Sequence, residues 1–245
     1  MRSVADSHIY KEASFMNKIE ALQNRKSVRK YLNRKITGTL KIDIENTFKN
    51  LTALDEKNRI EWNIDSSNEC KYNIYSLKTK WNNVDLVEFG FEGEQVVINL
   101  TQMGLGTLWH AMGGIKNSPC NITSGYEESN GKKTFMQKMV SNITKPHMRK
   151  ELSELIISGK EFLNEENREI LECARLAPSA MNKQPWGFKL LDEKSLSFEL
   201  LSHKKEYNFI DLGILLANSF IAANYYHNNV KIERKSDSCY VLIFN

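Results

Sequence analysis

The order helix, strand, helix occurs twice in this chain, and this repetition constrains the fold more than any single motif. Residues 87–90 (VEFG) open a long apolar helical pattern, and residues 210–213 (IDLG) open another of similar character. Ahead of each come a helical pattern with regularly spaced apolar residues and then a β-prone run. These paired patterns cover 40–54 and 72–77 in the first copy, and 165–177 and 186–191 in the second. The sequence therefore predicts two related halves that each combine helices with strands.

Length and composition agree with a folded protein that buries a substantial core. The chain has 245 residues, of which 41% are hydrophobic. Its longest apolar stretch, Ile210 to Ala223, is interrupted by Asp211 and Asn218 and is too short to span a bilayer. Residues 1–16 lack the apolar core of a signal peptide. We therefore expect a cytoplasmic protein without a membrane segment.

Charge and cysteine usage argue against two further classes. The net charge of +4 is small for this length and comes with no dense basic tract, so nucleic acid is not an expected partner. The cysteines form no CxxC pair and no histidine lies near them in the sequence, which argues against a metal site and for reduced thiols. The four are Cys70, Cys120, Cys173 and Cys239.

Residues 177–186, APSAMNKQPW, are too irregular for a helix or a strand. Pro178 and Pro185 fix φ and remove two backbone donors, while Ser179, Asn182 and Gln184 offer short polar groups that can reach a bound ring. The segment is therefore either a ligand-contacting loop or a helix-stop loop that leads into a strand.

A second motif, NRKSVRKY, covers residues 24–31. Arg25, Ser27 and Arg29 alternate, which places them on one side of an extended segment. Two guanidiniums that flank a hydroxyl suit a phosphate or an anionic ring edge, because arginine supplies planar, permanently charged donors. The alternative is a solvated basic surface, the usual fate of short basic runs.

Together, RKSVRKY and APSAMNKQPW resemble the FMN-dependent nitroreductase family. Its members carry an Arg-x-Ser-x-Arg/Lys element for the flavin and a Pro-Ser-x-x-Asn-x-Gln-Pro-Trp loop, and a homodimer shares the active site. In ordinary members the two motifs lie a few tens of residues apart, whereas here about half the chain separates them. This spacing resembles the branch in which two nitroreductase-like halves are fused in one polypeptide.

The resemblance implies an α+β fold in which each half has a mainly antiparallel sheet flanked by helices, packed about a pseudo-two-fold axis. FMN would lie between the halves, and fusion would make the chain a monomeric pseudo-dimer. The first copy has residues 51–66, LTALDEKNRIEWNIDS, where the second has its loop, and these lack the prolines and the Ser/Asn/Gln set. At most one complete site is therefore expected. We expect an N-terminal lead over 1–16, a first half over 17–160 and a second half over 161–245.

The resemblance also implies roles for the motif residues. One set would bind the flavin phosphate, ribityl chain or pyrimidine edge, namely Arg25, Lys26, Ser27 and Arg29, with Arg149 and Lys150 at the phosphate. From the opposite half, the ring would be contacted by Pro178, Ser179, Ala180 and Asn182, and Gln184 would brace that loop. Arg149 and Lys150 could equally begin an exposed basic helix.

A glycine-rich segment follows the first apolar helix. Gly104, Gly106 and Thr107, with Gly113 and Gly114 further on, would lie against the isoalloxazine, where glycine permits close approach of a backbone N–H to N5. The alternative is a glycine cap at the helix end. Two departures from the related branch are Leu108, where cysteine is usual, and an inserted His110-Ala111-Met112.

The chain shows no Ser/His/Asp or Cys/His set and no carboxylate pair placed by spacing, so no catalytic residue is predicted and the flavin would carry the chemistry. The predicted function is an NAD(P)H oxidoreductase that passes hydride through FMN N5 to a nitroaromatic, quinone or similar acceptor. The alternative is a flavin-binding or flavin-free scaffold of the same fold without turnover. The acceptor and the choice between NADH and NADPH are not determined by these motifs.

Overall fold

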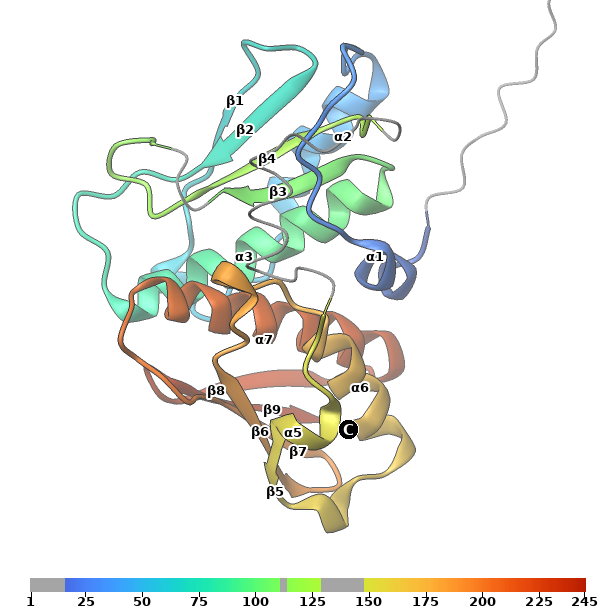
Figure 1. Ribbon diagram of the computed structural model, residues 1–245, viewed down its shortest axis with the longest axis vertical. Helices are drawn as coiled ribbons and strands as arrows, with labels where there is room; N and C mark the ends of the chain where they lie inside the picture. The colour runs from blue at the N-terminus through green and yellow to red at the C-terminus, as the bar shows by residue number, and fades with distance from the viewer. Residues whose placement is uncertain (1–15, 111–113, 129–147) are drawn as a thin grey trace, which may run out of the picture.

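A computed structural model describes residues 16–110, 114–128 and 148–245 of the chain. Two sheets enclose two central helices, α3 (Asn83–Gln102) and α7 (Tyr207–Tyr226), which lie stacked between them (Figure 1). The other helices of the described residues cover the flanks of this arrangement. They are α1 (Lys18–Asn24), α2 (Thr39–Thr47), α5 (Leu152–Leu155) and α6 (Glu165–Arg175), with short 3-10 turns η1 (Phe48–Asn50), η2 (Glu56–Asn58), η3 (Lys160–Phe162) and η4 (Ala180–Asn182).

The two sheets repeat one strand order. The first runs β1-β2-β4-β3 and the second runs β5-β6-β7-β9-β8, so the last four strands of the second match the first in order along the chain. Among the described strands, every neighbouring pair is antiparallel except β5 with β6, which is parallel. The α+β fold with two related halves is therefore confirmed. The strands are β1 (Asn63–Asp65), β2 (Lys71–Tyr75), β3 (Gly106–His110), β4 (Asn121–Gly125), β5 (Ile156–Ser158), β6 (Trp186–Asp192), β7 (Ser195–Leu200), β8 (Val230–Ser236) and β9 (Cys239–Phe244).

The central helices approach closely at two glycines. A Cβ atom added to Gly90 would lie 2.2 Å from the carbonyl oxygen of Ile210, and one added to Gly213 would lie 2.0 Å from that of Val87. The contact is reciprocal. Gly90 lies against Ile210, one turn before Gly213, and Gly213 lies against Val87, one turn before Gly90. The VEFG and IDLG patterns are thus the pseudo-two-fold contact between the halves.

The expected helices and strands form, but several differ in extent from the sequence patterns. The 40–54 pattern is helical only to Thr47 and then through η1, after which Leu51 is extended. The first long helix ends at Gln102, and the residues after its glycine-rich turn form strand β3, which contains Trp109. A capping box between Asn82 and Asp85 fixes the beginning of α3.

Helix α7 is longer than the apolar stretch predicted. It spans 20 residues, and by length and composition alone it could cross a membrane. Most of it is nevertheless buried inside the protein, where Leu212, Leu215 and Leu216 are fully enclosed. It is therefore a core helix of this fold.

A linking arm, residues 148–158, joins the first sheet's half to the second sheet. It carries α5 and β5. Strand β5 lies before the predicted boundary at residue 160, yet it pairs with β6 at the edge of the second sheet. The arm thus belongs by sequence to the first half and by pairing to the second. The boundary itself stays a prediction.

Candidate functional site

The N-terminal basic motif lies along the edge of the first sheet. Ser27 forms a parallel bridge with Thr107, and the Val28 N–H donates to the Thr107 carbonyl oxygen at 2.8 Å. A Cβ on Gly106 would lie 2.8 Å from the Val28 side chain, so only glycine permits this approach. Two predicted cofactor-binding segments, far apart in sequence, therefore lie side by side.

The other predicted glycines have different surroundings. Gly104 is exposed with φ +78, and its N–H donates to the Thr101 carbonyl oxygen. It therefore caps the end of α3, which is the alternative given above for this glycine-rich segment. Gly114 is exposed with φ +70. Gly113 lies outside the described residues. Lys26 is also exposed and pairs with Glu127 at 2.9 Å.

The 177–186 loop has an unusual backbone. Met181, Asn182 and Gln184 all have positive φ, at 55°, 55° and 48°, which is uncommon for residues other than glycine. The Ser179 hydroxyl oxygen accepts from the Gln184 N–H at 2.9 Å, and the Ala180 N–H donates to the Asp211 carboxylate at 2.9 Å. These bonds hold the loop in one conformation against α7.

The linking arm binds this loop directly. Arg149 donates to the Asn182 side-chain oxygen at 2.5 Å and to the Leu176 carbonyl oxygen at 3.1 Å. The Lys150 N–H donates to the buried Gln184 side-chain oxygen at 2.8 Å, and its ammonium donates to the Gln184 carbonyl oxygen at 3.0 Å. Arg149 and Lys150 therefore lie against the loop of the second half, and their assignment to a flavin phosphate stays a prediction.

A buried carboxyl group lies among the charges of this region. Glu94 of α3 is 0% exposed, and its carboxylate accepts from the Trp109 indole N–H at 2.6 Å. Burial raises the pKa of Glu94 to about 7, against the opposing effects of Arg25, the Trp109 N–H and Arg149. Burial lowers the pKa of Arg25, partly offset by Glu94. Arg25, Glu94 and Arg149 therefore interact electrostatically at one place.

The charge of Arg149 depends on the same neighbours. Burial and then the Arg25 cation lower the pKa of Arg149 to about 10, and Glu94 opposes this shift. Both guanidiniums are cations at neutral pH, because arginine keeps its proton in proteins. The first-half motif and the linking arm thus place two cations near one internal carboxyl group, next to the second-half loop.

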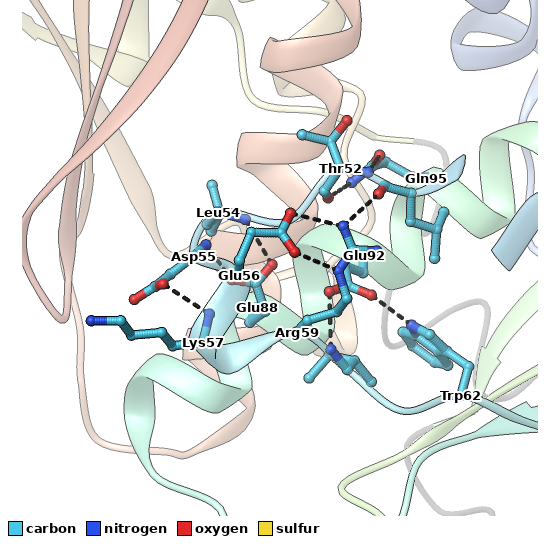
Figure 2. A network of polar contacts seen from close by, with 12 residues as sticks. Thr52, Leu54, Asp55, Glu56, Lys57, Arg59, Trp62, Glu88, Glu92 and Gln95 are labelled. Carbon is cyan, nitrogen blue, oxygen red and sulfur yellow. Dashed lines mark hydrogen bonds and ion pairs between the residues drawn. The ribbon is translucent and has the colours of Figure 1, made fainter. Parts of the chain in front are cut away.

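The corresponding place in the first half is closed by a polar network (Figure 2). Glu88 accepts from the Leu54 and Asp55 N–H groups at 2.8 and 3.1 Å. Glu92 accepts from the Ile60 N–H at 3.0 Å and from the Trp62 indole at 2.9 Å. These carboxylates hold the 51–62 segment over α3.

Five buried acidic residues among the described ones were not singled out by the sequence patterns. Glu88 and Glu92 stand four residues apart on α3 and are both 1% exposed, but both bond to the 51–62 segment, so the expectation that no catalytic carboxylate pair is present stays a prediction. The available signal was acidic residues inside otherwise apolar helices, which are costly unless paired. The five are Asp85, Glu88, Glu92, Glu94 and Asp211.

Comparisons with known proteins now assign the family. A family model described as "Putative TM nitroreductase" matches residues 17–223. The chain belongs to this family. Its resemblance to nitroreductases, inferred from the two motifs, is thereby confirmed. This nitroreductase-family chain is similar to the crystal structure of a putative nitroreductase from Thermotoga maritima, with 30% identity, a TM-score of 0.79 and coverage of 98% of this chain and 100% of that one.

Shorter similarities to other nitroreductases accompany this match. A putative nitroreductase from Desulfovibrio desulfuricans, solved in complex with FMN, covers 57% of this chain and 95% of its own at 13% identity and a TM-score of 0.41. An oxygen-insensitive NADPH nitroreductase from Helicobacter pylori is 44% identical over 46 residues, which are 19% of this chain. The matched region spans only 22% of that relative.

Proposed function

We propose that the protein is an FMN-dependent NAD(P)H oxidoreductase that reduces a nitroaromatic, quinone or similar acceptor. The observation that carries the proposal is the convergence of three segments. The Arg25–Arg29 motif lies beside Gly106 and Thr107, and Arg149 joins this region to the loop of the opposite half. Family membership supports the same conclusion.

The residues present fit a flavin mononucleotide. The Arg25 Nε and one Glu94 carboxylate oxygen are buried and have no hydrogen-bond partner among the described residues, so each leaves a hydrogen-bonding group for a polar ligand. Arg25 and Arg29 would donate to the phosphate or the pyrimidine edge, with Ser27 beside them. The backbone of Gly106 and Thr107 would lie along the ring.

The second-half loop would cover the cofactor from the other side. Pro178, Ser179 and Ala180 are half-buried at its start, where Asp211 fixes the Ala180 N–H. Asn182 and Gln184 are held by Arg149 and Lys150, so we assign them to bracing the loop. When bound, FMN supplies hydride transfer between nicotinamide and acceptor, and this chain holds, orients and shields it.

The position of positive charge bears on the redox chemistry. Arg25 lies close enough to Arg149 to lower the pKa of Arg149, so the site carries a concentrated positive charge. Such charge stabilises an anionic ligand and a reduced, anionic ring more than a neutral one. We therefore expect this chain to favour the reduced cofactor relative to free FMN.

The test is an absorbance spectrum of the protein purified with added FMN, followed by anaerobic addition of NADH and then NADPH. Flavin bands that bleach with either nucleotide would support the oxidoreductase. A protein that rejects FMN would refute it.

One observation favours a second candidate, a scaffold that binds flavin or nothing and does not turn over. Several loop groups already have partners within the protein, since Ser179 bonds to Gln184 and Ala180 to Asp211. A protein that turns yellow with FMN but stays oxidised with both nucleotides would support the scaffold. We further propose a monomeric, cytoplasmic protein with a small-molecule acceptor as its partner.

A further inference from the structure

Glu94 carries an inference beyond the proposed function, on which it rests. The side chain is 0% exposed, and one oxygen accepts from the Trp109 indole while the other has no partner among the described residues. A buried carboxyl group with an unpaired oxygen is costly, so a compensating interaction is expected. The compensation available here is electrostatic and comes from Arg25 and Arg149.

The Glu94 carboxylate balances the charge of the two arginines only while no external anion is bound beside them. Arg25 and Arg149 repel each other, and Glu94 opposes that repulsion at both of them. An incoming phosphate or anionic ring edge brings its own negative charge to the same arginines. It would then also repel the ionised Glu94 carboxylate across a poorly solvated space.

We propose that Glu94 is the internal counter-ion of the Arg25–Arg149 pair and takes up a proton when FMN binds. The proton comes from solvent, adds to the Glu94 carboxylate and converts it to the neutral acid, which keeps its bond to Trp109 through one oxygen. FMN binding and Glu94 protonation are thus thermodynamically linked.

The sign of the linkage follows from the groups that surround Glu94. Burial raises the pKa of Glu94 to about 7 before any ligand binds, against Arg25, the Trp109 N–H and Arg149. A bound anion raises that pKa further, so FMN affinity falls as the pH rises above about 7, by at most about tenfold per pH unit for one coupled proton. The FMN phosphate does not mimic this trend, because its second ionisation, near pH 6, is complete before the window opens.

One other carboxyl group of the site titrates in the same range and must be separated. Burial raises the pKa of Asp211 to about 7, and Asp211 contacts the Ala180 N–H of the loop. A comparison of wild type with Glu94→Gln isolates Glu94, since Asp211 is intact in both. The arginines stay protonated throughout the window.

The chain offers a matched control in Glu92→Gln. Glu92 lies on the same helix, is similarly buried and also accepts from an indole N–H, that of Trp62, but it belongs to the network over the first-half segment (Figure 2). The glutamine removes the same charge from α3 in both variants. Only Glu94→Gln removes it beside Arg25 and Arg149.

The experiment is calorimetric titration of FMN into the full-length protein in two buffers of different ionisation enthalpy, at about pH 6 and about pH 8. Wild type and Glu92→Gln should take up close to one proton per FMN at the higher pH and much less at the lower pH. Glu94→Gln should lose that uptake and bind FMN several-fold tighter than wild type at the higher pH.

Three outcomes would overturn the inference. FMN binding to wild type without buffer-dependent heat would refute the linkage while leaving the proposed function intact, even if Glu94→Gln failed to fold. Proton uptake that persists in Glu94→Gln would show that another group takes up the proton, and Asp211 would be the first candidate. Failure of wild type to bind FMN at either pH would refute the proposed function and this inference together.

Discussion

Glu88 of α3 and Asp211 of α7 occupy equivalent positions, and each holds the backbone of its own half's loop. Both stand two residues before the glycine at which the central helices meet. Glu88 accepts from the Leu54 and Asp55 N–H groups, whereas Asp211 accepts from the Ala180 N–H. The two halves therefore keep the same anchoring device, but only the second half kept the loop typical of nitroreductases.

Glu88 makes stability depend on pH. Burial raises the pKa of Glu88 to about 8, although the two N–H donors oppose this. In the unfolded chain the carboxyl group ionises near pH 4.3, so between about pH 5 and about pH 8 the native state binds more protons than the unfolded state. We expect the free energy of unfolding, measured in urea, to fall as the pH rises through this window.

Glu88→Gln should flatten part of that slope, because the amide carries no titrating proton. It should also lower stability by about 1–2 kcal/mol, since one N–H of the pair loses its acceptor. Some dependence of stability on pH remains in this variant, because burial also raises the pKa of Glu92 and of Glu94. An unchanged pH slope in Glu88→Gln would mean that Glu88 is ionised throughout the range.

One flavin should bind per chain. Glu88 and Glu92 hold the 51–62 segment over α3 through three backbone N–H groups and the Trp62 indole, so the first half presents no open equivalent of the 177–186 loop. Titration of FMN against a known protein concentration, followed by fluorescence quenching, should saturate at one equivalent. Saturation at two would show that the first-half segment opens.

Alanine at either central glycine should destabilise the protein. The added Cβ would meet a backbone oxygen at 2.2 Å from Gly90 or at 2.0 Å from Gly213, and backbone cannot yield as a side chain can. We expect a loss of about 1–3 kcal/mol or more in urea unfolding. Gly187→Ala is the control, because its Cβ would meet only the flexible side chains of Ile157 and Leu201 at 3.2 Å. Equal effects at Gly90 and Gly187 would contradict the close helix contact.

Gln184 should couple the linking arm to the second-half loop. Its buried side chain accepts from the Lys150 N–H and donates to the Met148 carbonyl oxygen. Gln184→Ala should cost about 1–3 kcal/mol of stability and should increase proteolysis near the arm. Lys183→Ala, in the same turn but exposed, should change neither quantity. Resistance of the Gln184 variant to proteolysis would show that the arm is held elsewhere.

Arg25 and Arg29 should contribute to flavin affinity. Arg25→Ala or Arg29→Ala should weaken FMN binding by about 1.5–3 kcal/mol, the range for hydrogen bonds to charged groups. Arg34→Ala is a suitable control, because Arg34 stacks on Tyr126, 4.0 Å from the ring centre, instead of joining the motif. Unchanged affinity in both motif variants would refute their assignment to the cofactor.

Local patterns in the sequence determined most of the secondary structure. Apolar periodicity predicted α3, α6 and α7, and the β-prone runs became β2 and β6, because these signals depend on neighbouring residues only. The helix predicted over 40–54 ends early because Thr52, near its predicted end, exchanges two hydrogen bonds with the Gln95 side chain of α3. Thr52 and Gln95 are 43 residues apart in the sequence, so local patterns do not predict this contact.

The tertiary structure alone decided which motifs meet and where the buried charges lie. RKSVRKY and APSAMNKQPW could be read as two parts of one site through their resemblance to a family, but the contact of Val28 with Thr107 and that of Arg149 with Asn182 depend on how the chain folds back. Likewise, Glu94 reads in sequence as one more acid in an apolar helix. Its importance arises only when packing removes water and brings two arginines near it, because the energy of a charge depends on its surroundings.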